Sequence, residues 1–347
     1  MQILKRAGPG FITRASGTDG SILEGLSIHD KALSIRPAPT VDSPRETAIT
    51  ALTRLLSTYA THDGVFALGA PGVYASRASH VNRECAHILR LPCFSIIAQG
   101  AKTVIVAQDV HEYDPARMLV YSVALPIAAQ VTQASHAVPY LALRIDLEPQ
   151  KIAELVLKVY PNGLAPTQDR SAVYVTPVDE SMVKASVRLM ECLAQPSDSE
   201  LLAPLAVEEI LMRLLRGPLG IRVAQMGLTE SSIHQIAKAI SWLRANFSQP
   251  VKVEELAELV HMGVSSFHEH FKSVTSMSPL HYQKVLRLQE ARRLMLSATM
   301  DAGSASQVVG YLSPSQFTRE YSRLFGSAPT RDIARLRKEA RPAVESV

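Results

Sequence analysis

An internal repeat with an offset of 50 residues constrains the C-terminal third of this 347-residue chain more than any other feature. Aromatic, polar and proline positions of the first copy return in the second, so one supersecondary unit is used twice. The matched pairs are Ser265 and Ser315, Phe267 and Phe317, Phe271 and Tyr321, Pro279 and Pro329, Leu286 and Leu336, and Arg287 and Arg337.

Each copy has the pattern of a helix-turn-helix unit. The expected helix pairs are 253–260 with 265–274, and 304–309 with 315–324. Gly310 opens the turn of the second copy, where glycine can adopt a left-handed backbone without steric cost. Apolar periodicity over 280–296 predicts a rod-like helix between the two units, and the same pattern over 232–247 predicts a supporting helix before them.

The second helix of each unit has one apolar and one polar face. Phe267 and Phe271 are four residues apart, as are Phe317 and Tyr321, so these pairs face the core. A helix fits the DNA major groove, and polar side chains on its outer face can reach base edges. We therefore predict DNA contacts from Ser265, Ser266, His268, Glu269 and Lys272 in the first unit, and from Ser315, Gln316, Arg319 and Arg323 in the second.

The positive charge of the chain lies in the same region. Residues 231–347 contain 15 Lys and Arg against 10 Asp and Glu, whereas residues 1–230 contain 21 against 22. Such an excess suits a phosphate-binding surface, although an ordinary protein surface can also carry it. A module that binds an acidic protein is an alternative, and a salt-dependent preference for duplex DNA over other polyanions would exclude it.

Short β-rich runs dominate the region before the repeat. They cover 93–98, 103–107, 118–123 and 140–145, with turn residues between them, which predicts a small barrel or sandwich. Helical periodicity covers 44–61, 152–159, 182–193 and 205–215. The last two helices could pair two subunits or pack against their own barrel. The expected class is α+β, with an all-helical C-terminal region.

The same patterns divide the chain into four parts. Residues 1–43 lack a clear period and are expected to be a disordered extension. Residues 44–216 form the β-rich domain, and 217–230, with Gly217 and Gly220, are the expected linker. Residues 231–340 form the domain with the two helix-turn-helix units.

Residues 231–338 resemble the AraC/XylS-type regulator domain, and 44–215 resemble the N-terminal effector domain of one branch of that family. The first resemblance rests on Val309-Gly310-Tyr311, Ser313, Ser315-Gln316-Phe317, Arg319-Glu320-Tyr321, Phe325-Gly326 and Pro329. The second rests on Gln99-Gly100, Tyr113-Asp114-Pro115, Ser122, Leu125-Pro126 and Pro139-Tyr140-Leu141. Three positions depart from the family: Glu269 stands where many relatives have a basic residue, Ser276 where Gly is usual, and Ser306 where Ala is usual.

This resemblance implies a transcription regulator whose N-terminal domain is a cupin-like β-barrel that senses a small molecule or mediates pairing. The implied partners are double-stranded DNA, an unknown small-molecule effector, a second copy in a homodimer, and RNA polymerase if the protein is an activator.

Enzyme and metal chemistry have little support in the sequence. Cupin enzymes hold a metal with a His-x-His pair, a carboxylate and another His, and no His-x-His lies between residues 62 and 147. The segment from Gly69 to Gly72 lacks the Lys-Ser/Thr of a phosphate loop and is expected to be a hairpin turn. A barrel enzyme would need converging titratable residues, which the sequence does not indicate. We predict no catalytic residue, metal or cofactor.

The remaining features favour a cytoplasmic protein. Three cysteines match no zinc or redox spacing, and Cys85 and Cys93 are more typical of small buried residues than of a thiol sensor. The first 25 residues do not have the pattern of a signal peptide. No stretch of about 18 uncharged apolar residues is present, so no membrane partner is expected.

Overall fold

The computed structural model describes residues 43–339 except 83, 116, 166–170 and 299. All but the last residue of the predicted extension over 1–43 lies outside these described residues. Ser43 caps helix α1 (Pro44–Tyr59): its Oγ accepts from the Glu46 amide at 3.3 Å, and its own amide donates to Glu46 Oε2 at 2.8 Å. This reciprocal pair satisfies two amides that the first helical turn leaves unpaired.

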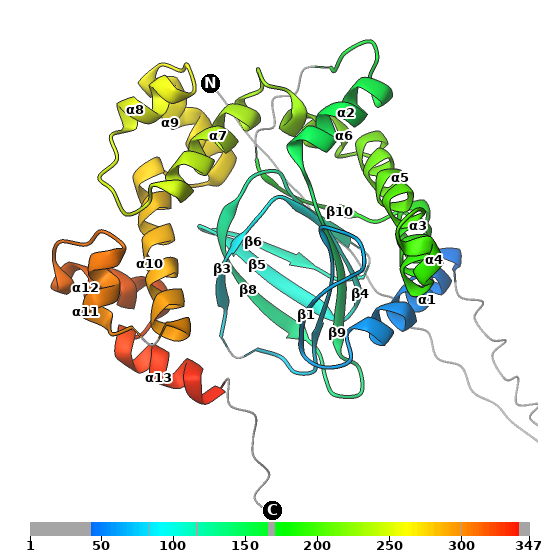
Figure 1. The fold of residues 1–347 in the computed structure, drawn as a ribbon, viewed down its shortest axis with the longest axis horizontal. Coiled ribbons are helices and arrows are strands. Elements are labelled where there is room, and N and C mark those ends of the chain that lie inside the picture. The colour runs from blue at the N-terminus through cyan, green and yellow to red at the C-terminus, as the bar shows by residue number, and fades with distance from the viewer. Residues whose placement is uncertain (1–42, 83, 116, 166–170, 299, 340–347) are drawn as a thin grey trace, which may run out of the picture. The chain divides into compact units, whose positions relative to one another are not determined.

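In the part of the chain that the structure describes, ten strands form two antiparallel sheets that face each other (Figure 1). The larger sheet has the order β1-β2-β9-β4-β7-β10 and the smaller one the order β3-β8-β5-β6. The α+β class is confirmed, and the barrel wall consists of two separate hydrogen-bonded sheets. The strands are β1 (Gly64–Ala67), β2 (Val73–Ala78), β3 (Ala86–Arg90), β4 (Cys93–Gln99), β5 (Ala101–Val106), β6 (Asp109–Tyr113), β7 (Arg117–Tyr121), β8 (Leu125–Gln133), β9 (Tyr140–Asp146) and β10 (Val173–Pro177).

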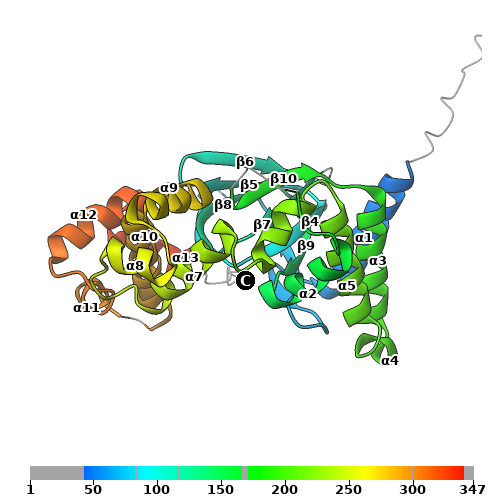
Figure 2. The same cartoon turned by 90° about the horizontal axis from the view of Figure 1, so that it is seen from above.

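The outer face of the larger sheet is apolar and covered by helices. Phe94, Ile96 and Val120 on this face are fully buried, and α1 contacts β4 and β9. Figure 2 shows α1, α3 and α5 stacked at the side of this sheet. The helices of this region are α2 (Pro149–Val159), α3 (Glu180–Ala194), α4 (Pro196–Ser199), α5 (Ala203–Arg216), α6 (Gly220–Ala224) and the 3-10 turn η1 (Gln225–Gly227).

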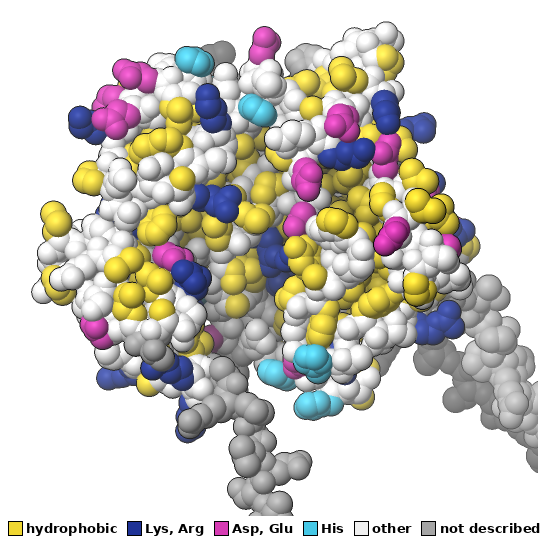
Figure 3. Space-filling view, in the orientation of Figure 1, with side chains coloured by type: hydrophobic (Ala, Val, Ile, Leu, Met, Phe, Trp, Pro, Cys, Tyr) yellow, Lys and Arg dark blue, Asp and Glu magenta, His cyan; other side chains and the backbone are white. Residues whose placement is uncertain are grey.

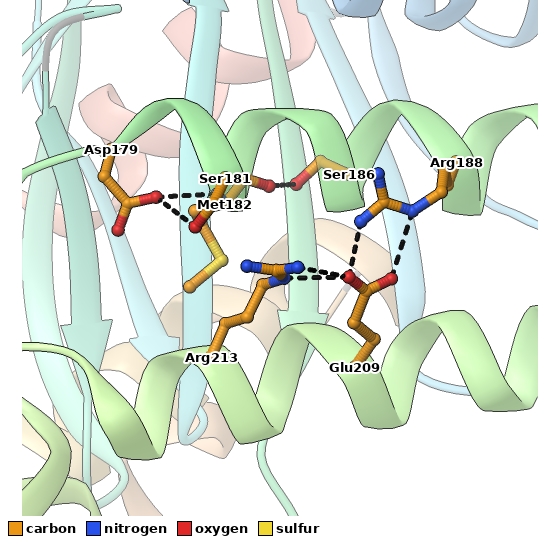
Figure 4. Close-up of polar contacts among 7 residues, drawn as sticks. All are labelled: Asp179, Ser181, Met182, Ser186, Arg188, Glu209 and Arg213. Atoms are coloured by element: carbon orange, nitrogen blue, oxygen red, sulfur yellow. Dashed lines mark hydrogen bonds and ion pairs between the residues drawn. The ribbon is translucent and has the colours of Figure 1, made fainter.

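Helices α3 and α5 pack against each other and are joined by an ion-pair cluster (Figure 4). Glu209 on α5 accepts from Arg188 Nε at 3.1 Å and from Arg213 Nε at 2.8 Å. Asp179 caps α3 by accepting from the Met182 amide at 2.8 Å. Within one chain these two helices contact each other and neighbouring helices, and the pairing of two subunits through them stays a prediction.

The C-terminal region is all helical, as predicted. Its helices are α7 (Ser232–Ala245), α8 (Val253–Leu259), α9 (Val264–Thr275), α10 (Pro279–Ser297), α11 (Ala302–Val308), α12 (Pro314–Phe325) and α13 (Pro329–Glu339). Helix α13 was not predicted from periodicity, although the repeat extends into it through Leu336 and Arg337. The predicted linker contains the short elements α6 and η1.

Burial makes the two β-region thiols poor nucleophiles. Cys93 is 1% exposed, and burial raises the pKa of its thiol to about 11. Burial also raises the pKa of Cys85, which is half-buried. Thiolate is the reactive form, so both shifts oppose oxidation or alkylation. In the part of the chain that the structure describes, no three His, Cys, Asp or Glu residues gather as a metal site, and no helix is long and apolar enough to cross a membrane.

Candidate nucleic-acid interface

Aromatic side chains form the core of each helix-turn-helix unit. Phe267 and Phe271 on α9 have ring centroids 5.6 Å apart, and Phe271 meets Tyr282 of α10 edge-on at 5.6 Å. In the second unit Phe317 and Tyr321 of α12 are 5.5 Å apart. All five rings are buried, so the predicted core face of each second helix is confirmed.

Left-handed residues shape the turn of each unit. In the first unit this residue is His261 (φ 54°), and in the second it is Gly310 (φ 86°). The left-handed conformation was predicted for Gly310. A Cβ at Gly310 would lie 2.0 Å from the Ser248 carbonyl oxygen, so only glycine fits there. Helices α9 and α12 also end at left-handed residues, Ser276 (φ 58°) and Gly326 (φ 73°).

The side chains predicted to contact DNA occupy the outer faces of α9 and α12. On α9 the exposed ones are Ser265, Ser266, His268, Glu269 and Lys272, and on α12 they are Ser315, Gln316, Arg319 and Arg323. The structure therefore brings each predicted set onto one solvent-facing helix surface.

Glu320, the acidic residue of α12, has its carboxylate engaged on the inner side of the helix. It accepts from Tyr311 Oη at 2.8 Å, from Lys284 Nζ at 3.0 Å, and from Gln316 Nε2 at 3.3 Å. Burial would raise the pKa of Glu320, but these hydrogen bonds outweigh it and lower the pKa. Within the described residues, Arg319 and Arg323 make no salt bridge, so their guanidinium groups are available on the outer surface.

Arg287 of α10 links the loop before the first unit to the turn of the second unit, and sequence reasoning found it only as a member of the repeat. Its guanidinium donates to the Phe247, Ser248 and Gln249 carbonyls at 2.6, 3.2 and 2.9 Å, and to the Gly310 carbonyl at 3.1 Å. The first three carbonyls belong to the loop after α7 and the fourth to the turn of the second unit. One rigid, planar donor therefore fixes both segments on α10.

Asp332 of α13 is completely buried and connects α13 to α10 and α12 in the second unit. It accepts from Arg292 Nε at 2.8 Å and Nη2 at 2.9 Å, from Tyr321 Oη at 2.7 Å, and from Arg335 Nη2 at 2.6 Å. Burial would raise the pKa of Asp332, but these donors outweigh it and hold the pKa below its ordinary value. The sequence gives no sign of this network, because Arg292 lies 40 positions before Asp332.

The first helix-turn-helix unit shares an apolar core with the β-rich region, whereas the second has its own core. Tyr282 Oη donates to the Ala124 carbonyl at 2.7 Å, and the Ala172 amide donates to the Val274 carbonyl at 3.1 Å. Phe267, Phe271 and the barrel residues belong to one apolar cluster, and a separate cluster surrounds Phe317. The second unit also meets the β-rich region directly: the Phe325 ring lies 5.0 Å from that of His87 on β3, and Arg335 Nη1 lies 2.6 Å from Glu84 Oε2.

Comparisons with known proteins agree with both halves of this description. The family described as the AraC-type transcriptional regulator N-terminus matches residues 69–222, and a helix-turn-helix domain family matches residues 256–335. The apo form of a lysine-to-alanine variant of ToxT from Vibrio cholerae has the same fold, with a TM-score of 0.50 at 7% identity over 76% of this chain and 98% of that one.

Two curated relatives match part of this chain. The transcriptional regulator ExsA of Pseudomonas aeruginosa is 28% identical over 131 residues, or 38% of this chain and 47% of that protein. The transcriptional activator RhaS of Pectobacterium carotovorum is 26% identical over 147 residues, or 42% of this chain and 52% of that protein. The chain thus spans about half the length of these relatives. With both family domains present in this order, the chain belongs to the AraC/XylS-type transcription regulators.

Proposed function

We propose that this chain is a sequence-specific DNA-binding transcription regulator that responds to a small-molecule effector held by its N-terminal barrel. One observation carries the DNA-binding part: α9 and α12 each present an exposed polar face, and Arg287 on the helix between them bonds both the loop before the first unit and the turn of the second. Two helices held in this way can enter successive major-groove segments, which recur about every 34 Å along the duplex.

The two helices would contribute unequally. On α12, Arg319 and Arg323 can donate to guanine or to phosphate, and Ser315 and Gln316 can bond base edges. On α9, Glu269 repels phosphate and can accept only from a donor such as cytosine N4, while Lys272 supplies the attraction. Ser265, Ser266 and His268 complete the proposed first contact surface. We therefore assign most of the phosphate attraction to the second unit.

The effector would act through the first unit, because the barrel and that unit share an apolar core. A homodimer that binds two half-sites, and contact with RNA polymerase if the protein activates, complete the proposal. It places the domains at 44–216 and 231–340 with a connection over 217–230. No catalytic step is part of it, in keeping with the matched relatives, which are transcription regulators.

The decisive experiment is genome-wide DNA capture with the purified chain, followed by affinity measurements on recovered fragments across salt concentrations. We expect a shared motif that binds far more tightly than random duplex. Arg319→Ala should weaken the specific site by about 1–3 kcal/mol if Arg319 makes a bidentate base contact. Arg117→Ala, which removes an exposed cation at the start of β7, serves as the matched control.

Two outcomes would contradict the proposal. If wild-type and Arg319→Ala chains bind the motif equally with the fold intact, Arg319 does not contact a base. If heparin or an acidic protein binds as tightly as duplex DNA at every salt concentration, the basic region has another partner.

A further inference from the structure

The space between the two sheets is lined by charged and phenolic side chains rather than by an apolar core alone. Directly opposed residues of antiparallel strands point to the same face of a sheet. Lys102 on β5 is opposed to Tyr113 on β6, and its Nζ lies 5.9 Å from the ring centroid of Tyr140 on β9 in the other sheet. This contact across the sheets places the Lys102 side chain inside the barrel.

Two further cations lie in the same interior. Arg144 on β9 is opposed to Ser95 on β4, and its guanidinium stacks 3.9 Å from the ring centroid of Tyr74. Arg90 at the end of β3 is close enough to repel Lys102 and to act on the hydroxyl of Tyr113. Figure 3 shows a recess near the centre of the view with Lys or Arg side chains (dark blue) in its wall.

Negative charge does not balance these cations. Among the described residues, the carboxylate that meets them is Asp146, whose Oδ1 lies 3.2 Å from Arg144 Nε. The structure gives no salt bridge from Arg90 or Lys102 to a described residue. Burial and then the charges of Arg90 and Arg144 lower the pKa of Lys102 to about 8, so Lys102 is still protonated at neutral pH. An unbalanced buried charge costs several kcal/mol, which a bound anion would offset.

A second, independent feature also points to a ligand. Tyr121 on β7 is 2% exposed, and its Oη has no hydrogen-bond partner in the structure. It faces the interior, since it is opposed to Cys93, which in turn is opposed to Asp146. Buried hydroxyl groups are normally hydrogen-bonded, so an unpaired one beside uncompensated cations indicates a missing acceptor.

We propose that the barrel interior binds an anionic organic molecule, with the acidic group held by Lys102, Arg90 and Arg144 and accepting from Tyr121 Oη. The rest of the ligand is apolar, because Val104 on the inner face of the strand that carries Lys102 is a buried aliphatic residue. This inference rests on the proposed function, since it names the chemical class of the effector that the barrel would sense.

The test uses a matched pair of dyes and the full-length chain. Anilinonaphthalene sulfonate carries one negative charge, and phenylnaphthylamine is its uncharged parent. We expect the sulfonate to bind at one site per chain and about tenfold more tightly than the parent, the ratio that corresponds to about 1.4 kcal/mol. Lys102→Met should remove this preference without changing the affinity for the parent dye. Lys184→Met, at an exposed lysine that pairs with Glu180 on α3, should retain it.

The thermal midpoint without ligand distinguishes a lysine that serves to bind an anion from a lysine that stabilises the fold. Lys102→Met removes a repelled, unpaired charge, so we expect its thermal midpoint without added anions to exceed that of the wild type. Arg90→Met is the second variant, with the same expectation, and circular dichroism checks that each variant is folded. A lower midpoint in both folded variants, or equal binding of the two dyes to the wild type, would overturn the inference.

Duplex DNA binding by the wild type, measured in parallel, separates the two proposals. A chain that binds DNA but shows no preference for the sulfonate would retain the proposed function and refute the anionic effector. A chain that prefers the sulfonate but binds no duplex DNA, with or without the dye, would refute the proposed function and leave the anion site standing.

Discussion

Arg287→Met should uncouple the two helix-turn-helix units while leaving each one folded. The change removes the donors to three carbonyls of the loop after α7 and to the Gly310 carbonyl. Hydrogen bonds to a charged group contribute about 1.5–3 kcal/mol each, but these four share one partly exposed guanidinium and do not add. We expect the free energy of unfolding to fall by about 2–4 kcal/mol.

The consequence for DNA binding follows from effective concentration. When the first recognition helix is bound, a rigid scaffold presents the second at its own groove segment, and a loose scaffold loses this advantage. We expect affinity for an operator with both segments to drop by about tenfold or more, while affinity for a truncated operator with one segment changes little.

The assays are urea unfolding and fluorescence anisotropy with the two operators. Arg293→Met is the control on the same helix, because Arg293 is exposed and pairs with Glu290 alone among the described residues. If Arg287→Met leaves both the unfolding free energy and the ratio of the two affinities at wild-type values, the joining role of Arg287 is refuted.

Three further predictions concern stability. Ser276→Gly relieves a left-handed residue but also removes the hydrogen bond that Ser276 Oγ donates to Asp109 Oδ2 at 2.7 Å, so we expect the free energy of unfolding to change by less than about 1 kcal/mol. Ser276→Ala loses the same bond and keeps the strain, so it should destabilise the chain by about 0.5–1.5 kcal/mol; urea unfolding of both variants checks this. Asp332→Asn should destabilise the chain at neutral pH. Since the pKa of Asp332 in the folded chain is lowered, the stabilisation that its carboxylate provides is complete at pH values above 3.8 and is lost as the pH falls further. The unfolding free energies of the two chains should therefore converge at low pH. Phe317→Ala should cost about 3–5 kcal/mol, and an unchanged melting profile would contradict its place in the core.

The helices of the C-terminal region could be predicted because their sequence repeats. Phe267 and Phe317 recur at the same place in each unit, and Gly310 marks a turn that only glycine fits. Local periodicity and one left-handed residue were therefore enough to place both units and their exposed faces. The repeat includes Arg287, but neither its role nor that of Asp332 could be predicted, since their partners are distant carbonyls and side chains that only the folded chain brings together.

The charged barrel interior shows where sequence reasoning failed. Arg144 lies in the predicted β-rich run 140–145 and Lys102 lies just before the run 103–107, but no convergence of titratable groups was expected in the barrel. Alternation within a strand assigns residues to two faces, and it does not say which face is enclosed by a second sheet. Only the pairing of both sheets shows that these polar residues point inward.

The position of Arg287 along α10 bears on how the barrel could influence the second unit. Tyr282 and Leu286 of this helix belong to the apolar cluster shared with the barrel, whereas Leu288 belongs to the cluster around Phe317. Arg287 therefore stands where one core ends and the other begins, and it is bonded to segments on both sides. Under the proposed function, a shift of the first unit would reach the second along α10 through this junction, while the contacts of His87 with Phe325 and of Glu84 with Arg335 would give the barrel a direct route as well. Coupling requires physical elements that both sites can bias, and α10 and these two contacts are the elements that the proposal would use.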